Sequence, residues 1–317
     1  MINRELIRLR VVQLAYAYNI KTGATWSTAE NELDLSFNRA YELYIYMLSI
    51  LRELYNLALI HHESQCARAK RFPNREDFAV SPALKALASN QCLAQLNSCS
   101  ALLSAEGENL RRRTKHESEA ELRIVDELYK QVMACNSLIA AVHKGERSYE
   151  TDRNTVRAIY REVFKHSQVL AEHLEDLDIY WNDDRFVVDS FIDKTLKQMN
   201  PELREEQPIL PPFDNEEDRK FAFSLFEKLH LNRTYLNELI ATHAKGWTFD
   251  RLAIMDISIA QAALTEILYT DVPIGVTFNK YLDLAHVYST PDSPFFLNGL
   301  LDAALTQLRS ERKVLKS

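Results

Sequence analysis

Apolar side chains recur every three or four positions along most of the chain, which is the period of an amphipathic helix. Residues 3–19 illustrate the pattern, because their large apolar side chains cover about two thirds of a helical surface while Arg4 and Arg8 lie one turn apart on one face. No segment has to be interpreted as a β-strand, whose apolar side chains would alternate every two residues. We therefore predict an all-α protein.

Capping and breaking residues divide the first two thirds of the chain. A loop at Thr22-Gly23-Ala24 is expected to separate the first helix from a long second helix near 27–62. Three or four further helices fit between about 82 and 200, with Ser81-Pro82 as a start signal and Lys144-Gly145 as a stop signal.

A compact series of helices is predicted for the last third. We expect helices at 217–230, after Asn232, from Thr248 to Thr270, near 277–287, and after Ser293-Pro294. The Thr248–Thr270 helix has one apolar stripe, formed by Leu252, Met255, Ile259, Ala262, Ala263 and Ile267, which we interpret as the core seam of a bundle. Gly299 lies inside the last helix, where glycine costs about 1 kcal/mol relative to alanine, so close approach of a backbone or ligand is a reasonable hypothesis.

One acidic segment sets the charge of the whole chain. The net charge is −7, but residues 176–218 alone contain 13 acidic and 4 basic residues. Four of the nine prolines lie between Pro201 and Pro212, so we predict an extended linker there and a boundary near residue 215. The resulting division is an N-terminal part (1–60), an inserted helical region (61–215) and a C-terminal helical domain (216–317).

Composition argues against several classes of protein. Only 6 of the 317 residues are glycine, about 2% against a usual value near 7%. Glycine-rich loops that hold nucleotide phosphates are therefore not expected. His61-His62, His166, His173 and the four cysteines show no zinc-site spacing, and no nucleophile elbow is present. We assign no catalytic residue, metal or cofactor, which leaves binding as the default function.

The chain is expected to be cytoplasmic. The four cysteines, at 66, 92, 99 and 135, form no Cys-x-x-Cys pair and are expected to be free thiols. No uninterrupted apolar run reaches the roughly 18 residues of a membrane helix, and Met1-Ile2-Asn3-Arg4-Glu5 lacks the plan of a signal peptide.

Two terminal stretches carry a family resemblance. RELIRLRVVQLAY (residues 4–16) and TPDSPFFLNGLLD (residues 290–302) resemble the first and last helices of the NusB family of transcription factors. Three further segments match the family in order: 250–256, 264–269 and 271–274, with Asn279, Leu284 and Ala285 continuing the last. The resemblance spans roughly 1–60 and 216–310. It implies a NusB-like double helical bundle with a large helical insertion between the second and third family helices.

The resemblance also implies a function without catalysis. Family members act in transcription antitermination: they bind boxA-type RNA of nascent ribosomal RNA transcripts together with NusE, a small-subunit ribosomal protein, and help assemble a complex on RNA polymerase. Position by position, the match suggests RNA contacts from Arg4, Arg8, Arg10, Asp292, Ser293, Phe296 and Asn298. It suggests protein contacts from Asp256 and Glu266. Some relatives form homodimers that hide the RNA surface, so a homodimer is also possible.

This sequence departs from the family pattern at charged positions. Glu5 and Leu6 interrupt the arginine-rich start, Phe295 replaces a common lysine, and Gln261 replaces an arginine. Three fewer phosphate contacts would flatten the salt dependence of RNA binding by roughly three units of slope at most. Two basic clusters in the insertion, Arg68-Lys70-Arg71-Arg75 and Arg111-Arg112-Arg113-Lys115, could replace the missing charges, although solvated surface is the ordinary role of such clusters.

Two other classes remain as alternatives. A helical protein–protein adaptor that has lost specific RNA binding would fit the missing charges and the net charge of −7. An RNA-modifying enzyme is a third possibility, because NusB-like domains also occur fused to methyltransferases that use S-adenosylmethionine. The shortage of glycine argues against it, since no glycine-rich loop follows a strand.

Overall fold

The protein is all-helical, as its sequence predicts. The computed structural model describes residues 1–20, 25–73, 75, 78–109, 115–145, 147–178, 180–213, 215–244, 246 and 248–316. Within these ranges the only β pairing is an isolated bridge between Ile2 and Phe213. The predicted loop at 22–24 and the second basic cluster's arginines, 111–113, lie outside the described residues.

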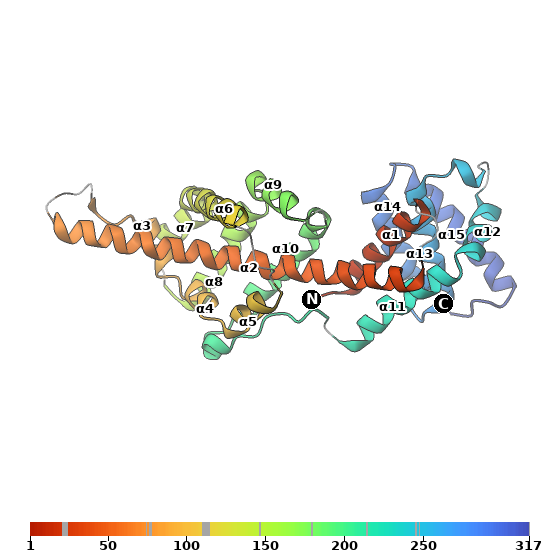
Figure 1. Cartoon of the computed structure of the whole chain (residues 1–317), viewed down its shortest axis with the longest axis horizontal. Coiled ribbons are helices and arrows are strands. Elements are labelled where there is room, and N and C mark those ends of the chain that lie inside the picture. Colours follow the sequence, from red (N-terminus) through yellow and green to blue (C-terminus); the bar gives the residue numbers. More distant parts are fainter. Residues whose placement is uncertain are drawn as a thin grey trace. The chain divides into compact units, whose positions relative to one another are not determined.

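The chain forms two compact units, each described separately here (Figure 1). Unit 1 consists of residues 1–37 and 212–317. It contains α1 (Arg4–Ile20), the start of α2 (Trp26–Arg71), α11 (Glu216–Leu231), α12 (Arg233–His243), the 3-10 turn η4 (Phe249–Arg251), α13 (Ile254–Tyr269), α14 (Ile274–Tyr288) and α15 (Ser293–Ser310).

Unit 2 consists of residues 38–211. It contains the rest of α2, then α3 (Pro82–Ala88), α4 (Gln91–Asn97), α5 (Ser100–Asn109), α6 (Lys115–Ala134), α7 (Asn136–Lys144), α8 (Tyr149–Ile159), the π-helical turn η2 (Tyr160–Phe164), α9 (Gln168–Leu177), α10 (Trp181–Gln198) and the 3-10 helix η3 (Pro201–Glu206). The predicted boundary at residue 60 therefore falls inside α2, while the predicted C-terminal part begins four residues after Pro212.

Helix α13 is the core of unit 1. Every side chain from Asp256 to Ile267 is buried, because α1, α11, α12, α14 and α15 all pack against it. A helix that is apolar on all sides is typical of such a central position. The single stripe predicted from sequence is thus part of a fully covered helix. Its start also differs from the prediction, since Thr248 precedes η4 and the backbone is extended at Leu252 and Ala253.

Polar caps divide unit 2 into more helices than the sequence predicted. Eight α-helices, α3 to α10, are described where three or four were expected. Asn90, Ser148 and Ser167 accept hydrogen bonds from backbone amides at the starts of α4, α8 and α9. The predicted stop at Gly145 is confirmed: this glycine ends α7 with a left-handed backbone, φ 68°.

Tyrosine hydroxyls attach α2 to the rest of unit 2. The buried Tyr44 hydroxyl lies 2.7 Å from Thr195 Oγ1, and the Tyr46 hydroxyl lies 2.7 Å from His173 Nε2. Burying a tyrosine is favourable only when its hydroxyl has a partner, and both do. Part of α2 is also long and apolar enough to cross a membrane by length and composition, but 67% of that window is buried within the fold, as in a core helix.

The proline-rich segment is not a free linker. Residues 201–206 form η3, and Gln95 Nε2 donates to the carbonyls of Asn200 and Arg204, each at 2.8 Å. The Leu210 amide donates to the Tyr44 hydroxyl at 3.1 Å, and Leu210 is buried. The prediction of an extended linker is corrected here: the buried Leu210 side chain and backbone hydrogen bonds to Gln95 and Tyr44 anchor the segment to unit 2.

Candidate nucleic-acid interface

A buried ion pair joins α1 to α13. Arg8 donates through Nε and Nη2 to the Glu266 carboxylate, at 2.9 Å to Oε2 and 2.8 Å to Oε1. The same carboxylate accepts from Thr277 Oγ1 at 3.0 Å and from the Tyr281 hydroxyl at 3.2 Å, both on α14. One carboxylate thus holds three helices of unit 1 together through charge-assisted hydrogen bonds.

The electrostatics agree with this geometry. Burial opposes the Arg8 charge, but the hydrogen bond and negative charge of Glu266 outweigh it and raise the Arg8 pKa. Burial and the same carboxylate raise the pKa of Tyr281 well above its usual value, so this hydroxyl stays protonated as a donor.

Three predicted contact residues therefore lie in the interior. Arg8 and Glu266 are almost completely buried, and Arg10 is too, with its Nη1 donating to Gln13 Oε1 at 2.7 Å. These three residues were expected to contact RNA or protein, and their burial does not support those contacts. In the structure their side chains bond to other residues of unit 1 and hold α1 in position.

Arg4 is different because it reaches the surface. Its side chain is 40% exposed, its Nε donates to Asp218 at 2.7 Å, and its guanidinium lies 3.9 Å from the centre of the Phe221 ring. A shallow hollow of about 510 Å³ opens beside it, with Lys220 and Tyr269 among its lining residues. Arg4 thus presents a partly exposed guanidinium at the start of α1, paired with Asp218 and stacked on Phe221.

A second polar cluster fixes the turn before α15. Asp256 accepts from the hydroxyls of Ser289 at 2.6 Å and Ser293 at 3.0 Å. The Ser293 hydroxyl is also 2.8 Å from Thr290 Oγ1. Asp256 and Ser293 are both buried, so this cluster orients the helix start and leaves other residues to meet a partner.

The exposed residues at the start of α15 share one face. Asp292, Phe295, Asn298 and Gly299 are all exposed, and the last three follow the spacing of a single helical stripe. Phe295 is 81% exposed, whereas the predicted contact residue Phe296 is half-buried. Asp292 occupies the N-cap position without a side-chain capping bond, which leaves its carboxylate available.

Gly299 has no packing role within the chain. A Cβ built on it would meet no atom within 4 Å. Close approach of another part of the protein therefore does not explain this glycine, and an external partner is the remaining form of the hypothesis. The sequence comparison with the family identifies Phe295 only as a replacement of a common lysine. Its spacing from Asn298 and Gly299 is the sequence signal that it shares their face.

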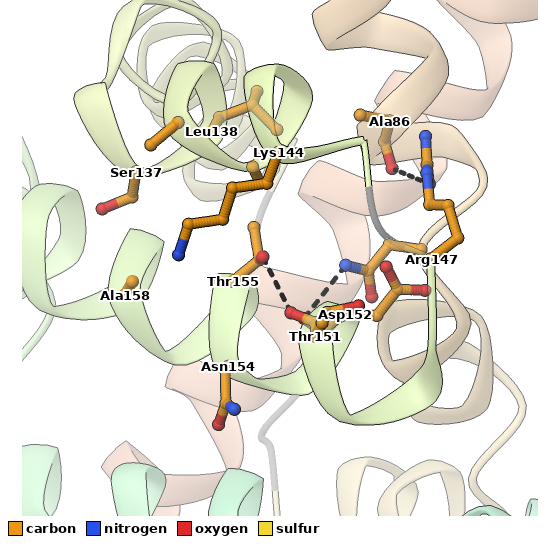
Figure 2. Close-up of a pocket in the computed structure, with 13 residues that line it drawn as sticks. Ala86, Ser137, Leu138, Lys144, Arg147, Thr151, Asp152, Asn154, Thr155 and Ala158 are labelled. Carbon is orange, nitrogen blue, oxygen red and sulfur yellow. Dashed lines mark hydrogen bonds between the residues drawn. The ribbon is translucent and has the colours of Figure 1, made fainter.

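A separate hollow lies in unit 2 (Figure 2). Its volume is about 350 Å³, and α3, α7 and α8 line it. Thr155 Oγ1 donates to the Thr151 carbonyl at 2.8 Å, and Arg147 Nη1 donates to Ser89 Oγ at 2.8 Å, so these polar groups bond within the fold. We assign no ligand to it. Within the described ranges no three histidine, cysteine or acidic side chains are grouped to hold a metal ion.

These features define a class: an all-helical protein whose candidate site is a solvent-facing helix surface held in place by buried polar clusters. The NusB family model matches residues 185–306. Curated proteins named "Transcription antitermination protein NusB" are also similar. The one from Koribacter versatilis is 35% identical over 99 residues, which is 31% of this chain and 68% of that protein.

Other relatives agree. The NusB protein of Sulfurimonas denitrificans is 32% identical over 102 residues, 32% of this chain and 74% of that protein. For Salinispora arenicola the identity is 42% over 82 residues, 26% of this chain and 60% of that protein. No solved structure matches the chain. The chain belongs to the NusB family, as its terminal motifs predicted.

Proposed function

We propose that this protein is a transcription antitermination factor that binds boxA-type RNA of nascent ribosomal RNA transcripts together with NusE and helps assemble a complex on RNA polymerase. The relatives named above carry antitermination in their names, and family membership is the basis of the proposal. A role of this kind needs no catalytic site or cofactor, and it places the protein in the cytoplasm, where transcripts are made.

The observation that carries the proposal is the exposed start of α15. Phe295 is 81% exposed and shares its helical stripe with the exposed Asn298 and with Gly299, a glycine inside a helix where a Cβ would meet no atom. Phe295 and Gly299 make sense on a surface that a partner covers. An aromatic ring provides a stacking face for an unpaired base, and the exposed Asn298 amide both donates and accepts.

The predicted contact residues take two roles in this proposal. Arg4, Asp292, Phe296 and Asn298 remain candidate RNA contacts, with Phe295 added. Arg8, Arg10 and Ser293 hold the surface in place from within. Asp256, expected in the NusE region, and Glu266, expected to contact protein, would act on a partner through the turn and the helices that they fix.

A substitution pair tests the proposal. Phe295→Ala should weaken binding of a boxA RNA, in the presence of NusE, by at least about fivefold, because base stacking on an aromatic ring contributes about 1–3 kcal/mol. Phe186→Ala is the matched control, since Phe186 on α10 is 84% exposed and lies outside unit 1. Equal effects of the two substitutions, or none from Phe295→Ala, would count against an RNA surface on α15.

The adaptor alternative has its own supporting observation. Val287 on α14 is 72% exposed, and several apolar residues of unit 2 are also exposed. A contact between proteins would cover such side chains. An adaptor predicts that Phe295→Ala weakens a protein complex while RNA affinity stays unchanged. Measuring NusE binding without RNA, on the same variants, separates the two functions.

A further inference from the structure

The C-terminal end of α2 carries a group of exposed positive charges. Arg68, Lys70 and Arg71 occupy its last turn, and Arg75 follows; all four side chains are exposed. In Figure 1 this end of α2 extends beyond the other helices of unit 2. We call these four residues, together with Phe72 and Phe78, the basic tip.

Two phenylalanines lie among these charges. The rings of Phe72 and Phe78 are 5.2 Å apart between centroids, at 41° to each other. The Arg71 guanidinium lies 5.5 Å from the centre of the Phe72 ring, and that of Arg75 lies 4.9 Å from the centre of Phe78. Phe72 is 41% exposed, so the tip offers flat aromatic and guanidinium faces to solvent.

Three of the four cations of the tip form no ion pair within the described part of the fold. Among the described residues, Arg68, Lys70 and Arg71 have no ion pair. Some exposed cations elsewhere in unit 2 do have partners, such as Lys130 with Asp126 and Arg161 with Asp193. A helix C-terminus favours a cation in its last turn, but that effect does not account for the exposed Phe72 ring beside these charges.

We infer that the basic tip is a second, sequence-tolerant binding site for single-stranded RNA. The guanidinium groups and Lys70 would contact phosphates, and unpaired bases would stack on Phe72 and the arginine planes. Arginine supplies three of the four charges, and its planar fork suits phosphate oxygens and base faces. An anionic membrane would instead draw both rings into the lipid, whereas Phe78 is only half-exposed and packs on Phe72.

This inference does not rest on the proposed function. It concerns unit 2, and it requires affinity for RNA without a boxA element. The tip would let the protein contact RNA outside a recognised sequence. It lies on a part of the chain that contains none of the family motifs. The tip would also restore positive charge that α1 and α15 lack relative to the family pattern.

The test uses the full chain and a labelled 15-nucleotide uridine RNA. The tip variant Arg68→Gln/Lys70→Gln/Arg71→Gln should lose at least about tenfold in affinity. The slope of log affinity against log salt should fall by about two, because each phosphate contact to a single strand contributes about 0.7. Phe72→Ala should lose about fivefold without changing that slope, since stacking releases no counterions.

The matched control removes three other charges. Lys85→Gln/Lys194→Gln/Lys197→Gln neutralises three exposed lysines of unit 2 that have no ion pair among the described residues. An equal loss in this control, or an unchanged affinity in the tip variant, would overturn the inference. So would tip-dependent binding to phosphatidylserine vesicles with uridine RNA binding unaffected. Unchanged thermal midpoints would show that every variant is folded.

The two proposals fail separately in this design. If the protein binds boxA and scrambled RNA equally, while its affinity for uridine RNA still depends on the tip and on salt, the proposed function alone is rejected. Discrimination that survives in a tip variant whose uridine affinity equals that of the wild type would reject the second site alone.

Discussion

The two arginines that begin α1 show how position within a fold decides what a side chain does. Arg4 and Arg8 are one helical turn apart, yet Arg4 is 40% exposed and Arg8 is buried against Glu266. A buried ion pair contributes little net stability when it is intact. When one member is removed, however, the other is left as an uncompensated buried charge, which is strongly destabilising. Arg8, one of the two first-helix arginines predicted to contact RNA, is thus buried in an ion pair with Glu266.

Replacing Arg8 should therefore unfold the protein more readily. Arg8→Ala should lower the free energy of unfolding by about 3–5 kcal/mol, because Glu266 would be left charged and buried. Arg4→Ala should lower it by at most about 1 kcal/mol, as for other exposed pairs. Urea denaturation of the two variants measures both values. A loss below about 1 kcal/mol for Arg8→Ala would contradict the buried pair.

Thiol reactivity provides a second test at this scale. Cys66 is half-buried, while Cys92, Cys99 and Cys135 are buried, and burial raises the pKa of Cys92 to about 12. At pH 8 the thiolate is the reactive form, so Cys66 should react first with a thiol reagent and Cys92 should react only on unfolding. Mass spectrometry after timed labelling measures the order. Labelling of Cys92 in the native protein as fast as Cys66 would contradict this packing.

At the scale of helices, the sequence predicted much of unit 1. The expected ranges 3–19, 217–230 and 277–287 agree closely with α1, α11 and α14, because amphipathic spacing and caps coincide there. Unit 2 was predicted poorly, since caps such as Asn90 and Ser167 resemble ordinary surface residues until the fold pairs them with an amide.

The site was predictable to a similar extent. Motif positions indicated α1 and the start of α15, but sequence alone gives no sign that Arg8 pairs with a residue 258 positions away. The exposed face of α15 could be found from helical spacing. Which of Phe295 and Phe296 faces solvent depends on the turn that Asp256 fixes, and that turn is a tertiary feature.

Two glycines give a test at the scale of helices. Gly299→Ala should raise the free energy of unfolding by about 1 kcal/mol, because alanine favours a helix and its Cβ meets nothing. The same variant should weaken the complex with RNA and NusE if a partner approaches this face. Gly145→Ala should instead lower the free energy of unfolding by about 1–2 kcal/mol, because Gly145 has φ 68°.

Thermal unfolding and RNA binding, measured on both glycine variants, separate stability from recognition. Destabilisation by Gly299→Ala would show that α15 packs more tightly than described. Unchanged binding of the stabilised variant would remove the partner explanation for the glycine.

At the scale of the whole molecule, the charge distribution is compatible with the RNA binding proposed for this acidic protein. The net charge is −7, but residues 176–218 hold 13 acidic against 4 basic residues, so the remainder is slightly positive. Local cations at Arg4 and on α2 therefore act without a long-range attractive field. In the proposed boxA contacts at α1 and α15, recognition should depend on stacking and hydrogen bonds more than on charge, with a shallow salt dependence. A steeper salt dependence is expected only for RNA bound at the basic tip.

Affinity for a boxA-type RNA, compared with a scrambled RNA of equal length, is the most direct test of the central claim. It should be measured by fluorescence anisotropy at two stated salt concentrations, with and without NusE. We expect tighter binding to the boxA sequence than to the scrambled RNA, further tightened by NusE, with a shallow salt slope. Equal affinity for the two RNAs in every condition would contradict it and favour the adaptor.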